Sequence, residues 1–293
     1  MRNEVYMGRD KIVTSLDPID ENILKIIEQI EPIFDKNRGE ISYLYDYYRG
    51  RQDILDKVKT IRPEINNKVV ENRAYEIVEF KTGYMFGEPL QYVQRGKNEE
   101  IIETEPISKL NQLMYYNNKS GQDRELGEWL HICGQGYRIV LPENDPNIPF
   151  TMNVLDPRKS FVVYDNSYMD KPLLGGLRID IEDGYQYSIY TDNKYYLIEY
   201  SKDKDGVIIE TRPHSIGYIP IIEYVANPSR MGAFEPVIPL LNTINKMGSN
   251  RMDGVEQFVQ SLMKFINADI EDEDIKKISQ LGAVKIFSKN NQP

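Results

Sequence analysis

The chain has 293 residues, 40% of them hydrophobic and 28% charged, which is typical of a folded protein and excludes a largely disordered one. Its formal net charge of −10 argues against tight binding to phosphates, because specific binders of duplex DNA usually carry a basic patch. The one cysteine, Cys133, excludes an internal disulfide, and no run of about 18 apolar residues predicts a membrane span.

The first third of the sequence predicts helices, placed between residues 19 and 136. The segment "DPIDENILKIIEQIEPIF" puts Ile23, Ile26, Ile27 and Ile30 on one helical face, after acidic residues that suit a helix start. Further helical patterns are "EISYLYDYYRGRQDILDKV", which contains a glycine break, and "NKVVENRAYEIVEFKTGYMFGEP". The last two, "PISKLNQLMYYNN" and "SGQDRELGEWLHICGQG", complete a helical N-terminal part.

Between residues 137 and 224 the pattern changes to short alternating runs rich in β-branched and aromatic residues. Runs such as "YRIVLP", "SFVVYD" and "YQYSIYT" are separated by turn sequences such as "ENDPN" and "DKDG". This spacing predicts a meander of about six or seven antiparallel strands. The segment "GYIPIIEYVANPSRMGAFEP" then predicts one more strand and a linker over residues 223–234.

A long helix is predicted over residues 235–266. One side forms an apolar seam with spacings of three or four, typical of a helix packed lengthwise against others: Leu241, Ile244, Gly248, Met252, Val255, Val259 and Leu262. Polar residues away from the seam are candidates to face a channel or a neighbouring copy: Lys246, Asn250, Arg251, Asp253, Gln257 and Lys264. A helix of about 50 Å would overhang the preceding domain, whose radius of gyration is about 17 Å, and copies of the chain are the economical partner.

No catalytic constellation is found in the sequence. The two histidines, His131 and His214, have no acid or cysteine at metal-ligand spacing, and no phosphate-binding loop or G-x-S-x-G motif occurs. The final segment predicts a short acidic helix, "DIEDEDIKKISQ", followed by a strand, "AVKIF". These features favour an assembly component without a cofactor over an enzyme.

Three stretches occur in a distinctive order: "NKVVENRAYEIVEFKTGYMFGEPLQY", then "GYRIVLP" with "VLDPRKSFVVYDN", then "IPIIEYVANPSRMGAFEPVIPLLNTINKMGSNRMDGVEQFVQSLMKF". In this order the chain resembles the portal proteins of tailed bacteriophages, in particular those of siphophages of Gram-positive hosts and their prophages. The resemblance spans nearly the whole chain. Its matching positions are Lys68, Tyr84–Pro89, Asp156, Pro157, Phe161–Asp165, Glu235–Val237 and Asp253.

The resemblance implies an α+β, portal-like fold with four parts. These are a wing over residues 1–222 (a helical N-terminal part and antiparallel strands), a linker over 223–234, a stem helix over 235–266 and the start of a small α/β clip over 267–293. It also implies a non-enzymatic structural subunit of the virion, one of typically twelve in a ring at a capsid vertex, the head–tail connector. DNA would pass through the axial channel during packaging and ejection.

The partners that the resemblance implies are other copies of the chain, the terminase large subunit, a head-completion or adaptor protein, and capsid and scaffold proteins. Double-stranded DNA would pass without sequence-specific binding, no membrane is involved, and assembly would take place in the host cytoplasm. Docking candidates in the clip are Glu271, Asp272, Asp274, Lys276 and Lys277. Because the family's remaining clip, second stem helix, channel loop and crown have no counterpart here, a C-terminally truncated chain is expected.

Two other functions are kept as alternatives. One is a different virion structural protein, such as a head-morphogenesis or adaptor component, which would form smaller assemblies than a portal ring. The other is a metal-dependent nucleic-acid enzyme that uses the carboxylates of "DIEDEDI" as a metal cluster. Consecutive acids at the start of a helix more often stabilise its dipole, which favours the structural interpretation.

Overall fold

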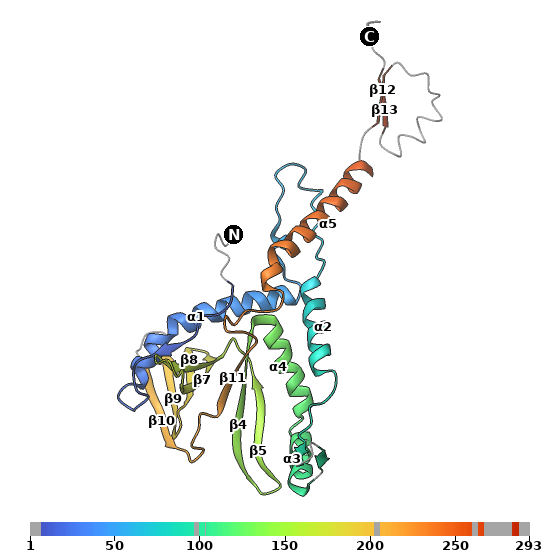
Figure 1. The fold of residues 1–293 in the computed structure, drawn as a ribbon. Helices are drawn as coiled ribbons and strands as arrows, with labels where there is room; N and C mark the ends of the chain where they lie inside the picture. Colours follow the sequence, from blue (N-terminus) through green and yellow to red (C-terminus); the bar gives the residue numbers. More distant parts are fainter. Residues whose placement is uncertain are drawn as a thin grey trace. The chain divides into compact units, whose positions relative to one another are not determined.

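The computed structural model describes residues 7–96, 100–102, 104–201, 206–259, 263–266 and 283–286. Figure 1 shows the chain as a ribbon. It divides into two compact units. Unit 1 contains Met1–Arg49 and Arg73–Val237, and unit 2 contains Gly50–Asn72 and Ile238–Pro293. Unit 2 therefore combines two segments that are far apart in the sequence.

The helices of unit 1 are α1 (Ile23–Tyr48), α2 (Arg73–Phe86), α3 (Glu105–Tyr116) and α4 (Lys119–Cys133). The predicted buried face of α1 is confirmed, since the four isoleucines of that face, Ile23, Ile26, Ile27 and Ile30, are at most 1% exposed. The structure joins two predicted helices into this single α1, which ends just before Gly50, where φ is +94°. A positive φ is easily adopted only by glycine, which explains why the helix stops there.

Two sheets form the β part of unit 1, where the sequence predicted a single meander. The six-stranded sheet has the order β1 (Val13–Thr14), β6 (Ser160–Asp165), β7 (Pro172–Ile181), β8 (Gly184–Tyr190), β9 (Lys194–Ser201) and β10 (Val207–Pro213). Strand β1 pairs with β6 in parallel, and the other pairs are antiparallel. The three-stranded sheet has the order β11 (Ile221–Val225), β4 (Gln135–Asp145) and β5 (Ile148–Leu155).

Shorter elements complete the chain. Unit 1 also contains β2 (Gln94–Arg95), β3 (Ile101–Ile102) and the 3-10 turn η2 (Glu235–Val237). Unit 2 contains the 3-10 turn η1 (Asp53–Asp56), the helix α5 (Ile238–Val259), and the parallel pair β12 (Met263–Ile266) and β13 (Ala283–Ile286). The predicted strand "AVKIF" is confirmed over Ala283–Ile286 as β13, whereas its last residue and the predicted acidic helix before it lie outside the described residues.

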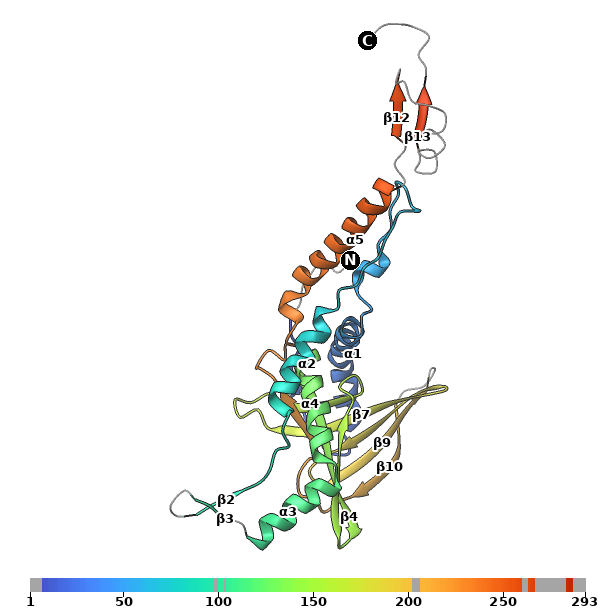
Figure 2. The ribbon, with the colours of Figure 1, turned by 90° about the vertical axis from the view of Figure 1, so that its right-hand side faces the viewer.

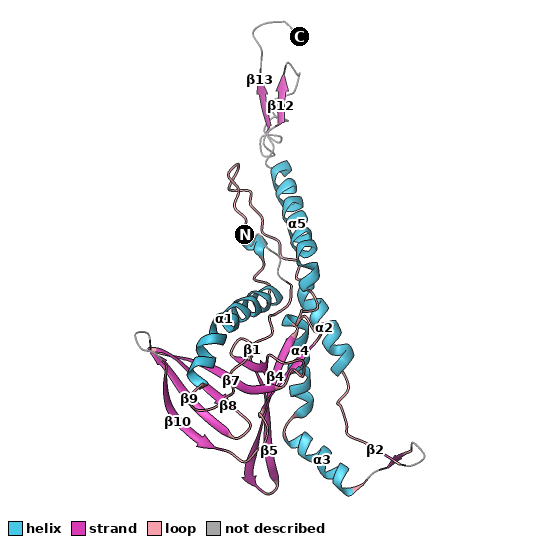
Figure 3. Cartoon of the chain, turned by 60° about the vertical axis from the view of Figure 1, so that its left-hand side comes forward, coloured by secondary structure: helices cyan, strands magenta, loops and turns pink. Residues whose placement is uncertain are grey.

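Helix α1 covers one face of the six-stranded sheet, and Figure 3 shows this arrangement. The core there joins the isoleucines of α1 and Phe34 to sheet residues such as Phe161 and Tyr187. Gly176 makes room for the Phe161 ring, because a Cβ atom at this position would lie 2.2 Å from it. The opposite face packs on the three-stranded sheet through Val162 and Ile221. Unit 1 thus has a helix–sheet–sheet arrangement.

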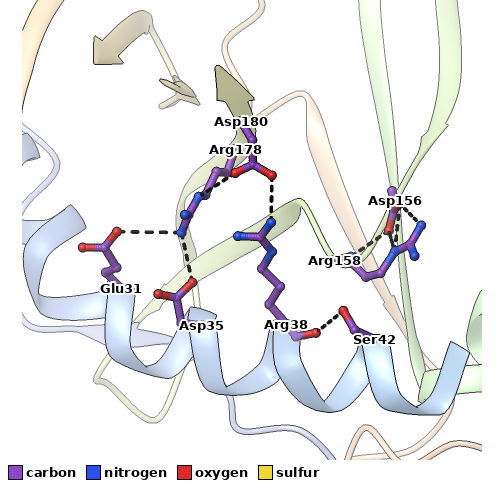
Figure 4. A network of polar contacts seen from close by, with 8 residues as sticks. All are labelled: Glu31, Asp35, Arg38, Ser42, Asp156, Arg158, Arg178 and Asp180. Atoms are coloured by element: carbon purple, nitrogen blue, oxygen red, sulfur yellow. Dashed lines mark hydrogen bonds and ion pairs between the residues drawn. The ribbon is translucent and has the colours of Figure 1, made fainter. Parts of the chain in front are cut away.

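A polar network fastens α1 to β7 at the edge of this core (Figure 4). Arg178 of β7 donates to Asp35 of α1 at 3.0 Å, and Arg38 of α1 donates to Asp180 of β7 at 2.8 Å. Each strand-to-helix pair matches an arginine with an aspartate. Since several of these groups are partly exposed, the network fixes the orientation of α1 more than it adds stability.

The segment predicted as a linker over residues 223–234 is instead tightly held within unit 1. Its first residues belong to β11, and Arg230 forms a bidentate ion pair with Glu223, with N–O distances of 2.8 and 2.9 Å. The backbone N–H of Ala226 donates to Gly134 O, and that of Ala233 donates to His131 O. A Cβ at Gly134 would lie 2.3 Å from the Arg230 backbone, so the approach requires glycine.

Glu235 directly follows this segment and lies near the end of unit 1. Its carboxylate accepts the N–H groups of Gly8 and Gly232, both at 2.9 Å, and pairs with the buried Arg9. Arg9 also pairs with Glu40 of α1 at 3.0 Å. The contacts of Glu235 with Gly8 and Arg9 join residues 227 and 226 positions apart, so no local sequence pattern predicts them. The last turn before α5 is therefore fixed to unit 1 by a buried ion triad.

Candidate functional site

The most distinctive surface for assembly is the helix α5 together with the segment Gly50–Asn72, here called the strap. Figure 2 shows the strap alongside α5. Three side chains of α5 accept hydrogen bonds from strap backbone N–H groups. Asn245 Oδ1 accepts from Glu71 at 2.8 Å, Ser249 Oγ accepts from Val69 at 2.9 Å, and Asp253 Oδ1 accepts from Asn67 at 2.6 Å.

The spacing of these bonds follows from the geometry of the two segments. Residues four apart on a helix rise by about 6 Å, and residues two apart on an extended chain advance by about 6.6 Å. The helix positions increase by four while the strap positions decrease by two, so the strap runs antiparallel to α5. Each helical turn therefore presents one acceptor to every second N–H of the strap, which satisfies a backbone that has no strand partner.

Asp253 is the main electrostatic anchor of the strap. Its Oδ2 accepts from Lys57 Nζ at 2.9 Å and from Lys59 Nζ at 2.8 Å, while its side chain is only 6% exposed. Hydrogen bonding to Lys59 is the largest cause that lowers the pKa of Asp253, and bonds to Lys57 and Asn67 lower it further. The carboxylate therefore stays charged at neutral pH. It binds Lys57 and Lys59 at one end of a loop of the strap and Asn67 at the other end.

The side of α5 opposite the strap is exposed and mainly apolar, with the exposed Arg251 among its apolar side chains. Leu240, Met247 and Phe258 are separated by seven and eleven residues, close to whole numbers of helical turns, and Val255 lies next to them. Their exposed fractions are 59%, 68%, 79% and 56%, respectively. These four residues are here called the apolar stripe. Large apolar side chains gathered along one exposed helix face are typical of an interaction surface.

A third side of α5 is polar and exposed, and it lies between the strap side and the apolar stripe. It carries Thr243, Lys246, Asn250 and Gln257. Asn250 also accepts a hydrogen bond from Lys57 at 3.3 Å. The helix thus has one side that binds its own chain, one apolar side and one polar side.

The predicted channel-facing or inter-subunit candidates separate into groups in the structure. Lys246, Asn250, Arg251 and Gln257 are exposed on α5. Asp253 differs from that expectation, because the same chain occupies its side of the helix and Lys57 and Lys59 neutralise its charge. Lys264 belongs to β12, since the helix ends at Val259 and does not continue to residue 266 as predicted.

The predicted apolar seam is not buried along its whole length within the chain. Leu241 is buried, Ile244 and Gly248 are partly buried, and Met252 and Val255 are 49% and 56% exposed. Val259 is the last helical residue, and Leu262 lies outside the described residues. The clip candidates Glu271, Asp272, Asp274, Lys276 and Lys277 also lie outside them. In the single chain the seam therefore divides between a buried start and an exposed remainder.

Sequence reasoning missed the residues that hold the strap. Asn245 and Ser249 have no exposed surface, although both are polar. The signal that would have identified them is the spacing of Asn245, Ser249 and Asp253 by four residues on one helix face. A row of polar side chains on the helix face away from the apolar stripe indicates that this face accepts hydrogen bonds from the backbone of an extended segment.

Two motif positions in unit 1 have structural roles. Arg158 forms a bidentate pair with Asp156, which Figure 4 also shows, and its guanidinium lies 4.3 Å from the centre of the Tyr45 ring. Tyr164 donates a hydrogen bond of 2.6 Å to Glu223, and burial is the largest cause that raises the pKa of this tyrosine. These contacts join the strands to α1 and to β11.

The remaining chemical candidates are parts of the packed interior. His131 Nδ1 lies 3.1 Å from Thr82 Oγ1, and burial lowers the pKa of this histidine. Cys133 is fully buried, and burial raises the pKa of its thiol to about 12. Within the described ranges, no group of three or more His, Cys, Asp or Glu side chains is arranged to hold a metal ion. Among the helices described, none has the length and apolar character needed to cross a membrane.

Exposed apolar side chains along α5 are typical of a surface that contacts another protein. A family model described as "Phage portal protein, SPP1 Gp6-like" matches residues 27–292, which is most of the chain. The chain therefore belongs to this family of phage portal proteins, structural components of the bacteriophage capsid that serve in DNA packaging. A comparison with curated proteins gives no match.

Proposed function

We propose that this chain is one subunit of a ring at a capsid vertex, and that DNA passes through the channel of the ring during packaging and ejection. The observation that carries the proposal is the division of α5 into three sides. In a ring of parallel helices, each helix needs one side for its own subunit, one for its neighbour and one for the lumen. The strap, the apolar stripe and the polar side meet these three needs.

The apolar stripe provides a reason for α5 to associate with another copy. Burying one such side chain contributes about 1.5–3 kcal/mol, so four of them contribute several kcal/mol for each contact between neighbours. Because the stripe lies away from the strap, the contact can form without disturbing the hydrogen bonds of Asn245, Ser249 and Asp253. A subunit that is already folded can therefore join a ring.

The polar side supports a lumen that conducts DNA without retaining it. Thr243, Asn250 and Gln257 are uncharged, and Lys246 is the only cation among the four residues of this side. Over its whole length α5 carries Lys246 and Arg251 against Asp253 and Glu256, so the helix has no net charge. Because Asp253 and Glu256 contact the strap, the polar side itself carries one positive charge per subunit. This is far less than a basic DNA-binding patch carries, which keeps DNA affinity low.

Further parts of the proposal concern subunit number and partners. We infer a ring of about twelve copies from the resemblance to tailed-phage portals. Residues 267–293 would form part of the clip, with Glu271, Asp272, Asp274, Lys276 and Lys277 in contact with the terminase large subunit and head-completion proteins. Capsid and scaffold proteins would surround the assembled ring. The chain would act without catalysis.

Particle mass tests the proposed ring. Mass photometry of the purified chain, combined with negative-stain microscopy, is expected to show annular particles of about twelve subunits. The same measurement on a version extended at the C-terminus shows whether further sequence contributes to closure. Only monomers or small oligomers from both versions would favour an adaptor and contradict the portal ring.

A further inference from the structure

The outer side of the strap carries two isolated, highly exposed aliphatic residues. Val58 is 83% exposed and Ile61 is 81% exposed. Both lie in a loop whose inner side is anchored, because Lys57 and Lys59 on either side of Val58 reach Asp253. With both neighbours directed toward α5, the Val58 side chain is directed away from the helix. This part of the strap therefore presents apolar surface outward from unit 2.

Val58 and the apolar stripe lie at the same height along α5. Lys57 and Lys59 bind Asp253, which fixes Val58 at the level of that residue. Val255 is two positions further along the helix, or about 3 Å along its axis. The two valines are on opposite sides of unit 2, because the strap side and the stripe lie about half a turn apart on α5.

This arrangement makes the two surfaces suitable for each other in successive copies. When copies are related by rotation about an axis roughly parallel to α5, equal heights in one subunit become facing positions in neighbours. A contact between two different surfaces of the same chain repeats from copy to copy and closes into a ring. An isologous contact of stripe with stripe would instead stop at a dimer.

We propose that Val58 and Ile61 of one copy pack against Val255 and Phe258 of the next copy. The strap thus has two functions: its inner side holds α5, and its outer side is half of the subunit interface. Lys57 and Lys59 both form ion pairs with Asp253, so burying this part of the strap leaves neither lysine without a partner, and the cluster keeps one net positive charge. The proposal rests on the proposed ring and specifies which surfaces form it.

Disulfide cross-linking tests the pairing. The variant Val58→Cys/Val255→Cys is expected to form dimers, trimers and higher species in a ladder under mild oxidation, seen on a non-reducing gel. Cys133 does not compete, since it is fully buried and the pKa of its thiol is raised to about 12. A matched control, Val58→Cys/Leu240→Cys, moves the second cysteine about 22 Å along α5, and it should give at least tenfold less cross-linked product.

Three results would overturn the inferred contact. A double variant that oxidises only to a compact monomer would place both cysteines within one chain. A dimer formed by Val255→Cys alone would indicate stripe against stripe. Rings observed by microscopy without a ladder from the double variant would show that another surface forms the interface, while the portal function stands. If no multi-copy particle forms at all, the proposed ring is contradicted as well.

Discussion

Replacing Val255 with aspartate is expected to leave a folded chain that no longer forms rings. Val255 is 56% exposed in the single chain, so the change should alter the free energy of unfolding by no more than about 0.5 kcal/mol. In the proposed ring the same position is buried against a neighbour, where the substitution would remove an apolar contact and add an uncompensated charge. We expect each contact to weaken by about 3 kcal/mol, or roughly 100-fold.

Mass photometry and a thermal melt of the same sample separate the two effects. The matched control is Gln257→Asp, which adds the same charge two residues away on the polar side of α5. This control should keep the ring, because its side chain faces the lumen in the proposed arrangement. Intact rings from Val255→Asp would show that the apolar stripe is not an interface, and loss of rings from both variants would indicate a general effect of negative charge.

Replacing Asp253 with alanine is expected to release the strap from α5. The substitution removes the acceptor of four hydrogen bonds and leaves Lys57 and Lys59 without their common partner. Removing one member of a largely buried charged cluster costs about 2–3 kcal/mol. Because strap and α5 form one unit, this loss should appear as local opening of the strap, with unit 1 unaffected.

Hydrogen exchange of the strap amides measures this opening directly. The N–H groups of Asn67, Val69 and Glu71 should exchange about 30- to 150-fold faster in Asp253→Ala than in the unchanged protein. Gln257→Ala is the control on the same helix and should leave these rates unchanged. Equal protection of the three amides in both variants would show that Asp253 does not hold the strap.

The sequence allowed the elements of unit 1 to be predicted well where a periodic apolar face packs locally. The buried isoleucines of α1 follow one another at spacings of three and four, and apolar and polar residues alternate along the strands that they cover. The helical and the strand pattern therefore identify the two faces that meet in the same core. The division of the strands into two sheets was not predictable in this way. It depends on which strands pair across the chain, as β11 does with β4, and not on the pattern within a strand.

The candidate site shows a different limit of sequence reasoning. The sequence predicted an apolar seam along this helix, but spacing alone does not say whether a face packs on its own chain or on a neighbour. The buried side is marked by Asn245, Ser249 and Asp253, whose partners lie more than 170 residues earlier in an irregular segment. Because the strap residues show no periodic pattern, the sequence alone did not reveal that they pack against α5. The end of the helix was also missed, because Met263–Ile266 pairs with a strand nearly twenty residues later.

The most direct test is a cryo-EM reconstruction of the assembled particle at a resolution that shows side chains. The proposed arrangement predicts a ring of α5 helices around a channel, with Lys246, Asn250 and Gln257 toward the lumen. It also predicts Val255 of each copy in contact with the strap of the next. A reconstruction with the apolar stripe lining the lumen, or with α5 on the outside of the particle away from any neighbour, would contradict it.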